Sequence, residues 1–280
     1  MAVDGGDFCF TCGGTATTDE HVVPKWLQKK HNLWNQKLFL PNGTSIPYRQ
    51  LTIPLCARCN NEILSPIESR IQNHTASEPE IWKWAAKIHY GLTRKHDFLE
   101  WDRRAPGYKI GQVLKRKDPL ELDRHLAHSI SGGFRTDPDP FGSVFVFEFG
   151  KELEFNLANL LDPQVVGINV GSTGYVVFIK DTGMLRRQGS IVDLYRKMAT
   201  DSHVGKMFNF IANAWMHLYR FKCSYPIVMS KSFIALLGGP KLIEEKPFDM
   251  ALFEQIWTFL NAGRKTPIVS NEEYEARNGK

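Results

Sequence analysis

The alternation of apolar and polar residues predicts a short strand and a hairpin near the start of the chain. Val22 and Val23, followed by Pro24, indicate the end of a strand. Strand-forming residues flank an Asn42-Gly43 pair within 37–48, and this arrangement predicts a β-hairpin. The hairpin therefore lies between this strand and the first long helical pattern.

That helical pattern covers 60–71, where apolar residues recur at the spacing of one helix face. Pro66 interrupts it, so we expect the helix to kink there, or to restart with Ser65 as its N-cap and Pro66 at its first position. Helical spacing returns in 81–92, where we expect Trp82 and Trp84 to be core residues rather than base-stacking platforms.

The rest of the chain, 76–280, predicts a second domain of mixed secondary structure. A helix opened by Asp118-Pro119 comes first, and two amphipathic helices come later. The helices are expected over 204–221 and over 248–262, the second stopping at Gly263. Strands are expected over 143–149, 165–170 and 174–180, the last two joined by a hairpin turn at Gly171-Ser172-Thr173. This order indicates an α+β domain around a small antiparallel sheet.

Composition places the chain among ordinary globular proteins. It has 280 residues, of which 42% are hydrophobic and 23% charged, and these values exclude wholesale disorder and low-complexity structure. No apolar run approaches the roughly 18 to 20 residues of a membrane span, and the acidic N-terminus lacks the pattern of a signal peptide. We therefore expect a cytoplasmic protein with no membrane partner.

Charge permits a polyanionic partner but does not identify one. Thirty-five basic and 30 acidic residues give a net charge of +5. The stretch 94–117 concentrates basic residues, with Trp101 and Tyr108 interleaved. The clustered basic residues are Arg94, Lys95, Arg103, Arg104, Lys115, Arg116 and Lys117. The stretch is either a phosphate-gripping surface or a solvated loop.

The cysteines carry the strongest chemical signal. Four of the five form two Cys-x-x-Cys pairs, Cys9 with Cys12 and Cys56 with Cys59, whereas Cys223 stands alone and is expected to be a small core residue. Two intervening residues let both thiolates of a pair reach one tetrahedral zinc ion. A cytosolic chain keeps its thiols reduced, which disfavours a disulfide or redox interpretation. The 43 residues between the pairs exceed the spacing of an ordinary zinc module, so a folded segment must lie between them.

A short motif lies on each side of this gap. Glu20-His21-Val22-Val23-Pro24 follows the first pair, and Ile53-Pro54-Leu55 leads into the second pair, after which comes Asn60. In this order the motifs resemble the zinc-bearing HNH nucleases of the ββα-metal fold, over about residues 8–72. The resemblance implies a nuclease domain at 1–75 with a structural zinc on the four cysteines, and it implies that His21 is the general base.

The chemistry of phosphodiester hydrolysis agrees with this resemblance. His21 can be neutral near pH 7 and accept a proton from water. The oxygen ligands of Glu20 and Asn60 suit Mg²⁺ or Mn²⁺ as a catalytic ion. Lys25 and Arg58 are candidates for phosphate contacts. Adjacent residues of a regular strand point to opposite faces, so Glu20 and His21 share a site only if the backbone bends there.

Each of these residues also has a structural interpretation. His21 could be a satisfied structural histidine, Glu20 a solvated carboxylate and Asn60 a helix cap, and Asn61 could substitute for Asn60. The family's middle asparagine has no counterpart just before the second cysteine pair. Asn42 and Gln50 are the candidates for its role in orienting His21.

The sequence thus predicts an α+β protein in which a small zinc-stapled ββα-metal domain, 1–75, precedes a larger α+β domain, 76–280. The expected function is metal-dependent HNH-type cleavage of DNA, and the resemblance implies a place in bacterial restriction or phage defence. The second domain would position substrate, sense a trigger or bind a partner protein. The alternatives are a zinc-stapled module that binds nucleic acid or protein without chemistry, and a nuclease gated by a small ligand through 76–280.

Overall fold

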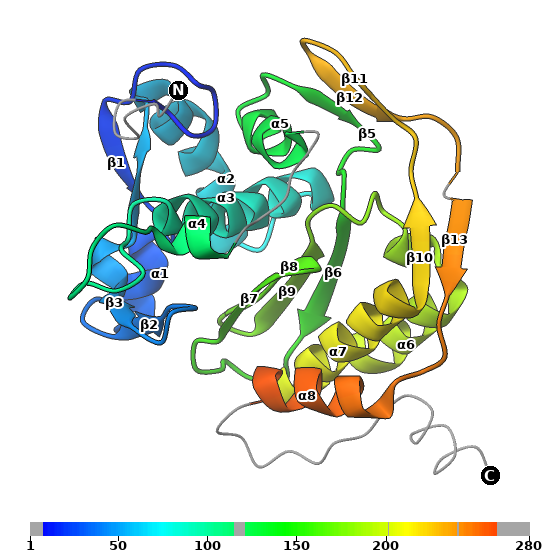
Figure 1. Ribbon diagram of the computed structural model, residues 1–280. Helices are drawn as coiled ribbons and strands as arrows, with labels where there is room; N and C mark the ends of the chain where they lie inside the picture. Colours follow the sequence, from blue (N-terminus) through cyan, green and yellow to red (C-terminus); the bar gives the residue numbers. More distant parts are fainter. Residues whose placement is uncertain (1–7, 115–120, 201, 240, 262–280) are drawn as a thin grey trace. The chain divides into compact units, whose positions relative to one another are not determined.

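The computed structural model describes residues 8–114, 121–200, 202–239 and 241–261, and these form two compact units (Figure 1). The first unit comprises the described residues up to Thr136 together with Ser230–Ile234, and the second comprises Asp137–Met229 and the residues from Ala235 onward. The division differs from the boundary expected after residue 75, because the long helix that follows residue 75 packs within the first unit.

The first unit is built on an antiparallel pair of strands, β1 (Thr18–His21) and β4 (Thr52–Leu55). In its register Glu20 faces Ile53 and His21 faces Thr52. The segment between them contains helix α1 (Lys25–Lys30), a hairpin of β2 (Lys37–Phe39) and β3 (Ser45–Pro47), and a 3₁₀ turn (Tyr48–Gln50). The predicted hairpin is therefore confirmed, and its turn uses Gly43 at a φ of +76°. The predicted strand ends at His21, just before Val22 and Val23.

Two helices follow β4. A π-helical turn (Arg58–Leu64) leads directly into α2 (Ser65–Gln72), which begins at Ser65 with Pro66 in its first turn. The prediction that the helix restarts at Pro66 is confirmed, although Leu64 rather than Ser65 is the N-cap. Proline fits there because its fixed φ suits the first turn of an α-helix.

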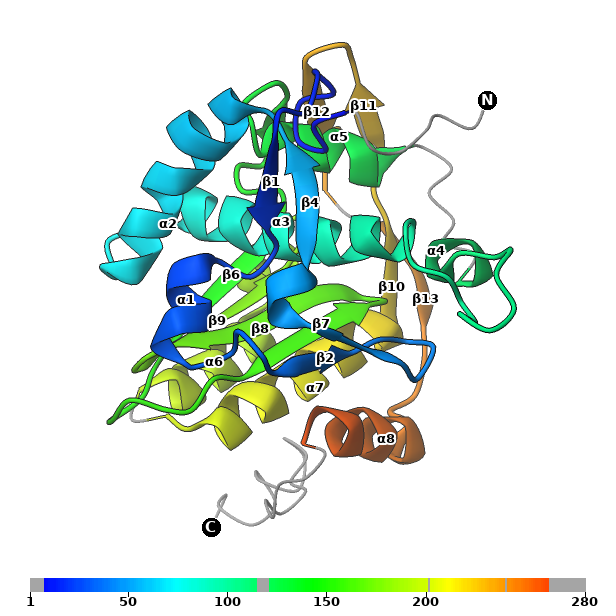
Figure 2. The ribbon, with the colours of Figure 1, turned by 90° about the vertical axis from the view of Figure 1, so that its left-hand side faces the viewer.

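Helix α3 (Glu78–His96) is the longest helix of the first unit, and Figure 2 shows it running behind β1 and β4. A capping box fixes its start, since the Ser77 N–H and hydroxyl each lie 3.0 Å from Glu80 Oε2. The side chains of Trp82 and Trp84 are buried, as predicted for core residues. Helices α4 (Ile110–Val113) and α5 (Leu122–Ser129) and strand β5 (Arg135–Asp137) complete this part. Residues 115–120, which include Lys115, Arg116, Lys117 and the expected helix start at Asp118-Pro119, lie outside the described residues.

The second unit contains a four-stranded antiparallel sheet in the order β6-β9-β8-β7. Its strands are β6 (Ser143–Glu148), β7 (Leu157–Leu161), β8 (Gln164–Val170) and β9 (Thr173–Phe178). Helices α6 (Gly189–Ala199), α7 (Val204–Arg220) and α8 (Met250–Leu260) bury one apolar core with the sheet. At Gly167 a Cβ would lie 2.6 Å from Ile211 Cδ1, so the close approach of α7 to β8 requires a glycine.

Four short strands occupy the region between α7 and α8. Strands β10 (Phe221–Ser224) and β13 (Lys241–Glu245) pair antiparallel, and β11 (Ile227–Met229) and β12 (Phe233–Leu236) lie between them in the sequence. Within the first unit, the Arg135 N–H donates to the Ser232 carbonyl at 2.9 Å.

The mixed α+β class with small antiparallel sheets is thus confirmed, and so are the three predicted strands at β6, β8 and β9 and the helices at α7 and α8. Strand β7, helix α6 and the short strands β10 to β13 were not predicted. Gly263, the expected end of the last helix, lies outside the described residues. Within the described ranges, every helix is too short or too polar to cross a bilayer.

Candidate functional site

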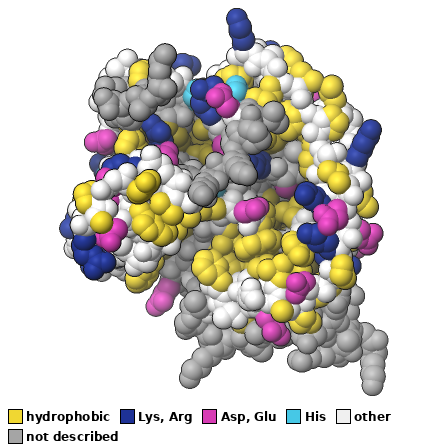
Figure 3. All heavy atoms as spheres, viewed as in Figure 1, with side chains coloured by type: hydrophobic (Ala, Val, Ile, Leu, Met, Phe, Trp, Pro, Cys, Tyr) yellow, Lys and Arg dark blue, Asp and Glu magenta, His cyan; other side chains and the backbone are white. Residues whose placement is uncertain are grey.

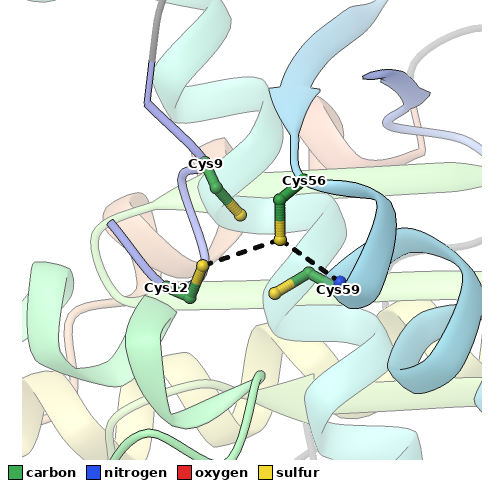
Figure 4. A group of neighbouring side chains, drawn as sticks. All are labelled: Cys9, Cys12, Cys56 and Cys59. Atoms are coloured by element: carbon green, nitrogen blue, oxygen red, sulfur yellow. Dashed lines mark hydrogen bonds between the residues drawn. The ribbon is translucent and has the colours of Figure 1, made fainter. Parts of the chain in front are cut away.

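The four paired cysteines converge on one point in the first unit (Figure 4). All four Sγ atoms lie within 4.8 Å of one another, and Cys12 Sγ lies 3.8 Å from Cys56 Sγ. Four thiolates at about 2.3 Å from a tetrahedral zinc ion would lie about 3.8 Å apart, so the donor set and its geometry fit zinc. Within the ranges that the structure describes, this is the one group of three or more such ligands close enough to share an ion.

The pairing of β1 with β4 explains how the two cysteine pairs meet across 43 intervening residues. The first pair sits in a tight turn, in which the Gly13 N–H donates to the Cys9 carbonyl at 2.8 Å. The second pair begins directly after β4, and the Cys59 N–H lies 3.4 Å from Cys56 Sγ. The antiparallel register places the start of β1 beside the end of β4, and this brings the pairs together.

The electrostatics of the cluster favour a bound cation. Burial disfavours thiolates, and it is the main cause that raises the pKa of Cys12 and of Cys59. Burial opposes ionisation of Cys9 as well, but hydrogen bonds from Thr11 and from the backbone outweigh it and lower its pKa to about 7. Four closely spaced thiolates repel one another, and a divalent ion would remove that repulsion.

His21, the predicted base, lies at the end of β1. Its side chain is 8% exposed, and its ring stacks on the indole of Trp34 with centroids 5.7 Å apart and planes at 23°. Neither Nδ1 nor Nε2 has a hydrogen-bond partner. Burial, and next the positive charge of Lys25, lower the pKa of His21 below its usual value, so the imidazole is neutral at pH 7.

Glu20 makes an ion pair that the sequence did not indicate. Its Oε1 lies 2.7 Å from Nζ of Lys87, a fully buried residue of α3. Lys87 Nζ also lies 3.0 Å from Glu68 Oε1 and 2.5 Å from the carbonyl oxygen of His21. The carboxylate of Glu20 therefore contacts α3, whereas the ring of His21 stacks on Trp34, as expected for adjacent residues of a regular strand.

Asn60, the other expected metal ligand, lies in the π-helical turn. Its Nδ2 donates to Thr18 Oγ1 at 3.2 Å. Thr18 and Glu20 share one face of β1, so Asn60 lies toward the face that carries Glu20. The hydrogen bond ties this part of the second cysteine pair's turn to the start of β1.

The remaining candidates lie at the surface or in other contacts. Lys25 and Arg58 are exposed, and Lys25 is the candidate whose charge acts on His21. Asn42 donates to the Trp101 carbonyl at 2.8 Å, and Gln50 is exposed. Sequence reasoning missed the His21 neighbour Trp34 and the ion-paired trio of buried Lys87 with the partly exposed Glu20 and Glu68. Each of these two groupings is formed by residues distant in the sequence.

The basic stretch that begins in the last turn of α3 is divided among different contacts. Lys95 donates to the Thr52 carbonyl at 3.1 Å, Arg94 pairs with Asp97 at 3.4 Å, and Arg103 and Arg104 are exposed. Figure 3 shows Lys and Arg side chains in several separate groups on the face that it draws. Arg104 also lies 3.3 Å from Asp102, so Arg103 and Arg104 are exposed members of the stretch, one of them ion-paired.

No protein-family model, no curated protein and no solved structure matches this chain.

Proposed function

We propose that the first unit is an HNH-type endonuclease, of the zinc-stapled ββα-metal kind, that hydrolyses DNA phosphodiester bonds. The observation that carries the proposal is His21, a buried imidazole with both ring nitrogens free of hydrogen bonds, next to the basic side chain of Lys25. The four-cysteine cluster and the antiparallel strands support it, because they hold the strand end that bears His21 in a fixed frame.

The chemistry assigned to this chain's residues is limited to proton transfer and charge. Neutral His21 accepts the proton of the attacking water through a ring nitrogen, and burial favours that neutral form. Lys25 places a positive charge near the reacting phosphate, and Arg58 offers a second cation for the nucleic-acid backbone. A zinc ion held by the four cysteines would supply no chemistry and would tie the two cysteine turns together.

The expected divalent ion, Mg²⁺ or Mn²⁺, fits the residues only in part. Asn60 offers an amide oxygen, but Oε1 of the Glu20 carboxylate is engaged by the Lys87 ammonium, which also pairs with Glu68. A Mg²⁺ site with few protein ligands normally relies on at least one free carboxylate. As arranged here, Glu20 and Asn60 do not provide that ion with both expected ligands.

The same observation favours a second candidate function. If the Glu20 carboxylate is unavailable, the first unit could act as a zinc-stapled module that binds nucleic acid or protein without cleaving it. One assay separates the two: purified full-length chain is incubated with supercoiled plasmid and Mg²⁺ or Mn²⁺. Nicking or linearisation that disappears in His21→Ala supports the nuclease, and DNA binding without cleavage supports the module.

A pocket in the second unit supports the further idea of a small-ligand gate. It has a volume of about 250 Å³ and is lined by apolar side chains of α6 and α7 together with His217, Arg220 and Asn213. A nuclease that cleaves only after addition of a small anionic molecule, and that loses this response in Arg220→Met, would support gating. Cleavage at full rate without any addition would exclude it.

A further inference from the structure

Three residues of α3 form a stripe that faces the strand pair carrying His21. Lys87, Gly91 and Lys95 are spaced four residues apart and so share one face of the helix. Lys87 Nζ donates to the carbonyl of His21, and Lys95 Nζ donates to the carbonyl of Thr52. His21 and Thr52 are cross-strand partners, so the two lysines bind the two strands at the same rung.

Gly91 allows this close approach. A Cβ at this position would lie 2.9 Å from Ile53 Cδ1 and 3.1 Å from Val22 Cγ2. A side chain there would require Ile53 and Val22 to repack, so glycine suits the tight contact between this face of α3 and the strand pair.

The two lysines differ in the groups around them. The Lys87 side chain has no exposed surface, and two carboxylates, those of Glu20 and Glu68, compensate its charge. Lys95 is partly exposed, and it donates a hydrogen bond to the carbonyl of Thr52. A buried ammonium is strongly unfavourable unless it is paired and hydrogen-bonded, so the position of Lys87 is determined by its three oxygen partners.

These partners come from separate segments: Glu20 and the His21 carbonyl from β1, and Glu68 from α2. An ammonium held by two carboxylates and a carbonyl resembles the oxygen environment of a cation site. In this protein the ammonium group of Lys87 is that cation.

We propose that Lys87 is a positioning residue for His21, and that Glu20 acts through Lys87 and is not a ligand of the catalytic ion. This inference rests on the proposed nuclease function. In this role Glu20 holds the Lys87 ammonium against the His21 carbonyl. That contact fixes the backbone of the residue that carries the imidazole. Displacement of a catalytic base by about 1 Å is enough to slow a reaction on the order of 100-fold.

The metal dependence of cleavage distinguishes the two roles of Glu20. The variants are Glu20→Gln and Lys87→Met, with Lys95→Met as the matched control on the same helix face. We expect the first two to lower kcat by roughly 10- to 100-fold, with the Mg²⁺ concentration for half-maximal activity unchanged. The double variant should be no worse than the poorer single variant, because both changes break one unit. Lys95→Met should keep kcat within about threefold of the native value, since it leaves Lys87 and both of its carboxylate partners unchanged.

A different result would overturn the inference. If Glu20→Gln raises the Mg²⁺ midpoint tenfold or more while Lys87→Met cleaves normally, then Glu20 is a metal ligand. If Lys87→Met does not fold, Glu20→Gln decides by itself, because it removes the Glu20 charge from the ion pair while Glu68 still compensates the Lys87 ammonium.

A second measurement does not depend on cleavage and separates failure of this inference from failure of the nuclease proposal. The ring proton signals of His21 are recorded by NMR at fixed pH for the native chain and for the Glu20→Gln, Lys87→Met and Lys95→Met variants. The inference predicts displaced or broadened His21 signals in the first two variants and native signals in the third. Native His21 signals in Glu20→Gln and Lys87→Met would overturn it, whether or not the chain cleaves DNA.

Discussion

The imidazole of His21 stacks on the indole of Trp34, with ring centroids 5.7 Å apart. This contact shields the ring on one side and contributes to the burial that lowers the pKa of His21. The two residues belong to different segments, one at the end of β1 and the other in the loop after α1. The indole therefore limits both the orientation and the solvation of the proposed base.

Trp34→Ala should raise the pKa of His21 toward its usual value, because removal of the indole lets water solvate the imidazolium. Because the neutral ring is the form that accepts the proton, a higher His21 pKa moves the acid limb of the pH–activity profile to higher pH. NMR titration of the His21 ring and the pH profile of cleavage should shift together. Trp101→Ala, at another partly exposed tryptophan, is the control. An unchanged His21 titration in Trp34→Ala would contradict the role given to the stacking.

Zinc content tests the four-cysteine cluster. Elemental analysis should find about one zinc per chain, and Cys56→Ser should lose it because three thiolates and a hydroxyl hold zinc far more weakly. The first unit should then unfold at lower temperature. Cys223→Ser, which changes a cysteine outside the cluster, should retain both zinc and stability. A zinc-free native chain purified without chelators would contradict the assignment.

The second unit should lose stability in mild acid. Burial, and next the charge of Arg220, lower the pKa of His217 to about 4. The unfolded chain then binds more protons than the folded chain between about pH 6.5 and pH 4, so the free energy of unfolding falls as pH falls through this window. Denaturant titrations at several pH values measure the effect, and His217→Gln should reduce the slope. If His217→Gln keeps the native pH dependence, other groups cause the loss of stability in mild acid.

The exposed pair Arg103 and Arg104 should contribute to DNA affinity. Charge reversal at both positions should weaken binding uniformly across sequences and reduce the dependence of log K on log salt by about two, one unit per lost phosphate contact. Fluorescence anisotropy with a labelled duplex at several salt concentrations measures this slope. Charge reversal of Lys29 and Lys30, two exposed lysines at the end of α1, provides the comparison. An unchanged slope would show that Arg103 and Arg104 make no phosphate contacts.

The sequence predicted features that depend on local spacing. The Cys-x-x-Cys pairs predicted the cluster, Asn42-Gly43 predicted the hairpin, and Pro66 predicted where α2 begins. Strand β7 was not predicted, because only Leu160 of its residues is buried and such an edge strand shows little alternation of apolar and polar residues. The burial of Lys87 could not be predicted, because a lysine in an amphipathic helix is normally expected to face solvent. Its burial depends on Glu20 and Glu68, which lie 67 and 19 residues away in the sequence.

The central claim is that His21 is the base of a nuclease, and plasmid cleavage by His21→Ala tests it most directly. The variant should keep its zinc and its DNA affinity, while the cleavage rate falls by roughly 10² to 10⁴. His74→Asn is the control, since it changes an exposed histidine of the same unit and asparagine tolerates the positive φ of 56° found there. It should cleave at the native rate. Native-rate cleavage by His21→Ala, with contaminating nuclease excluded by a mock purification, would contradict the account.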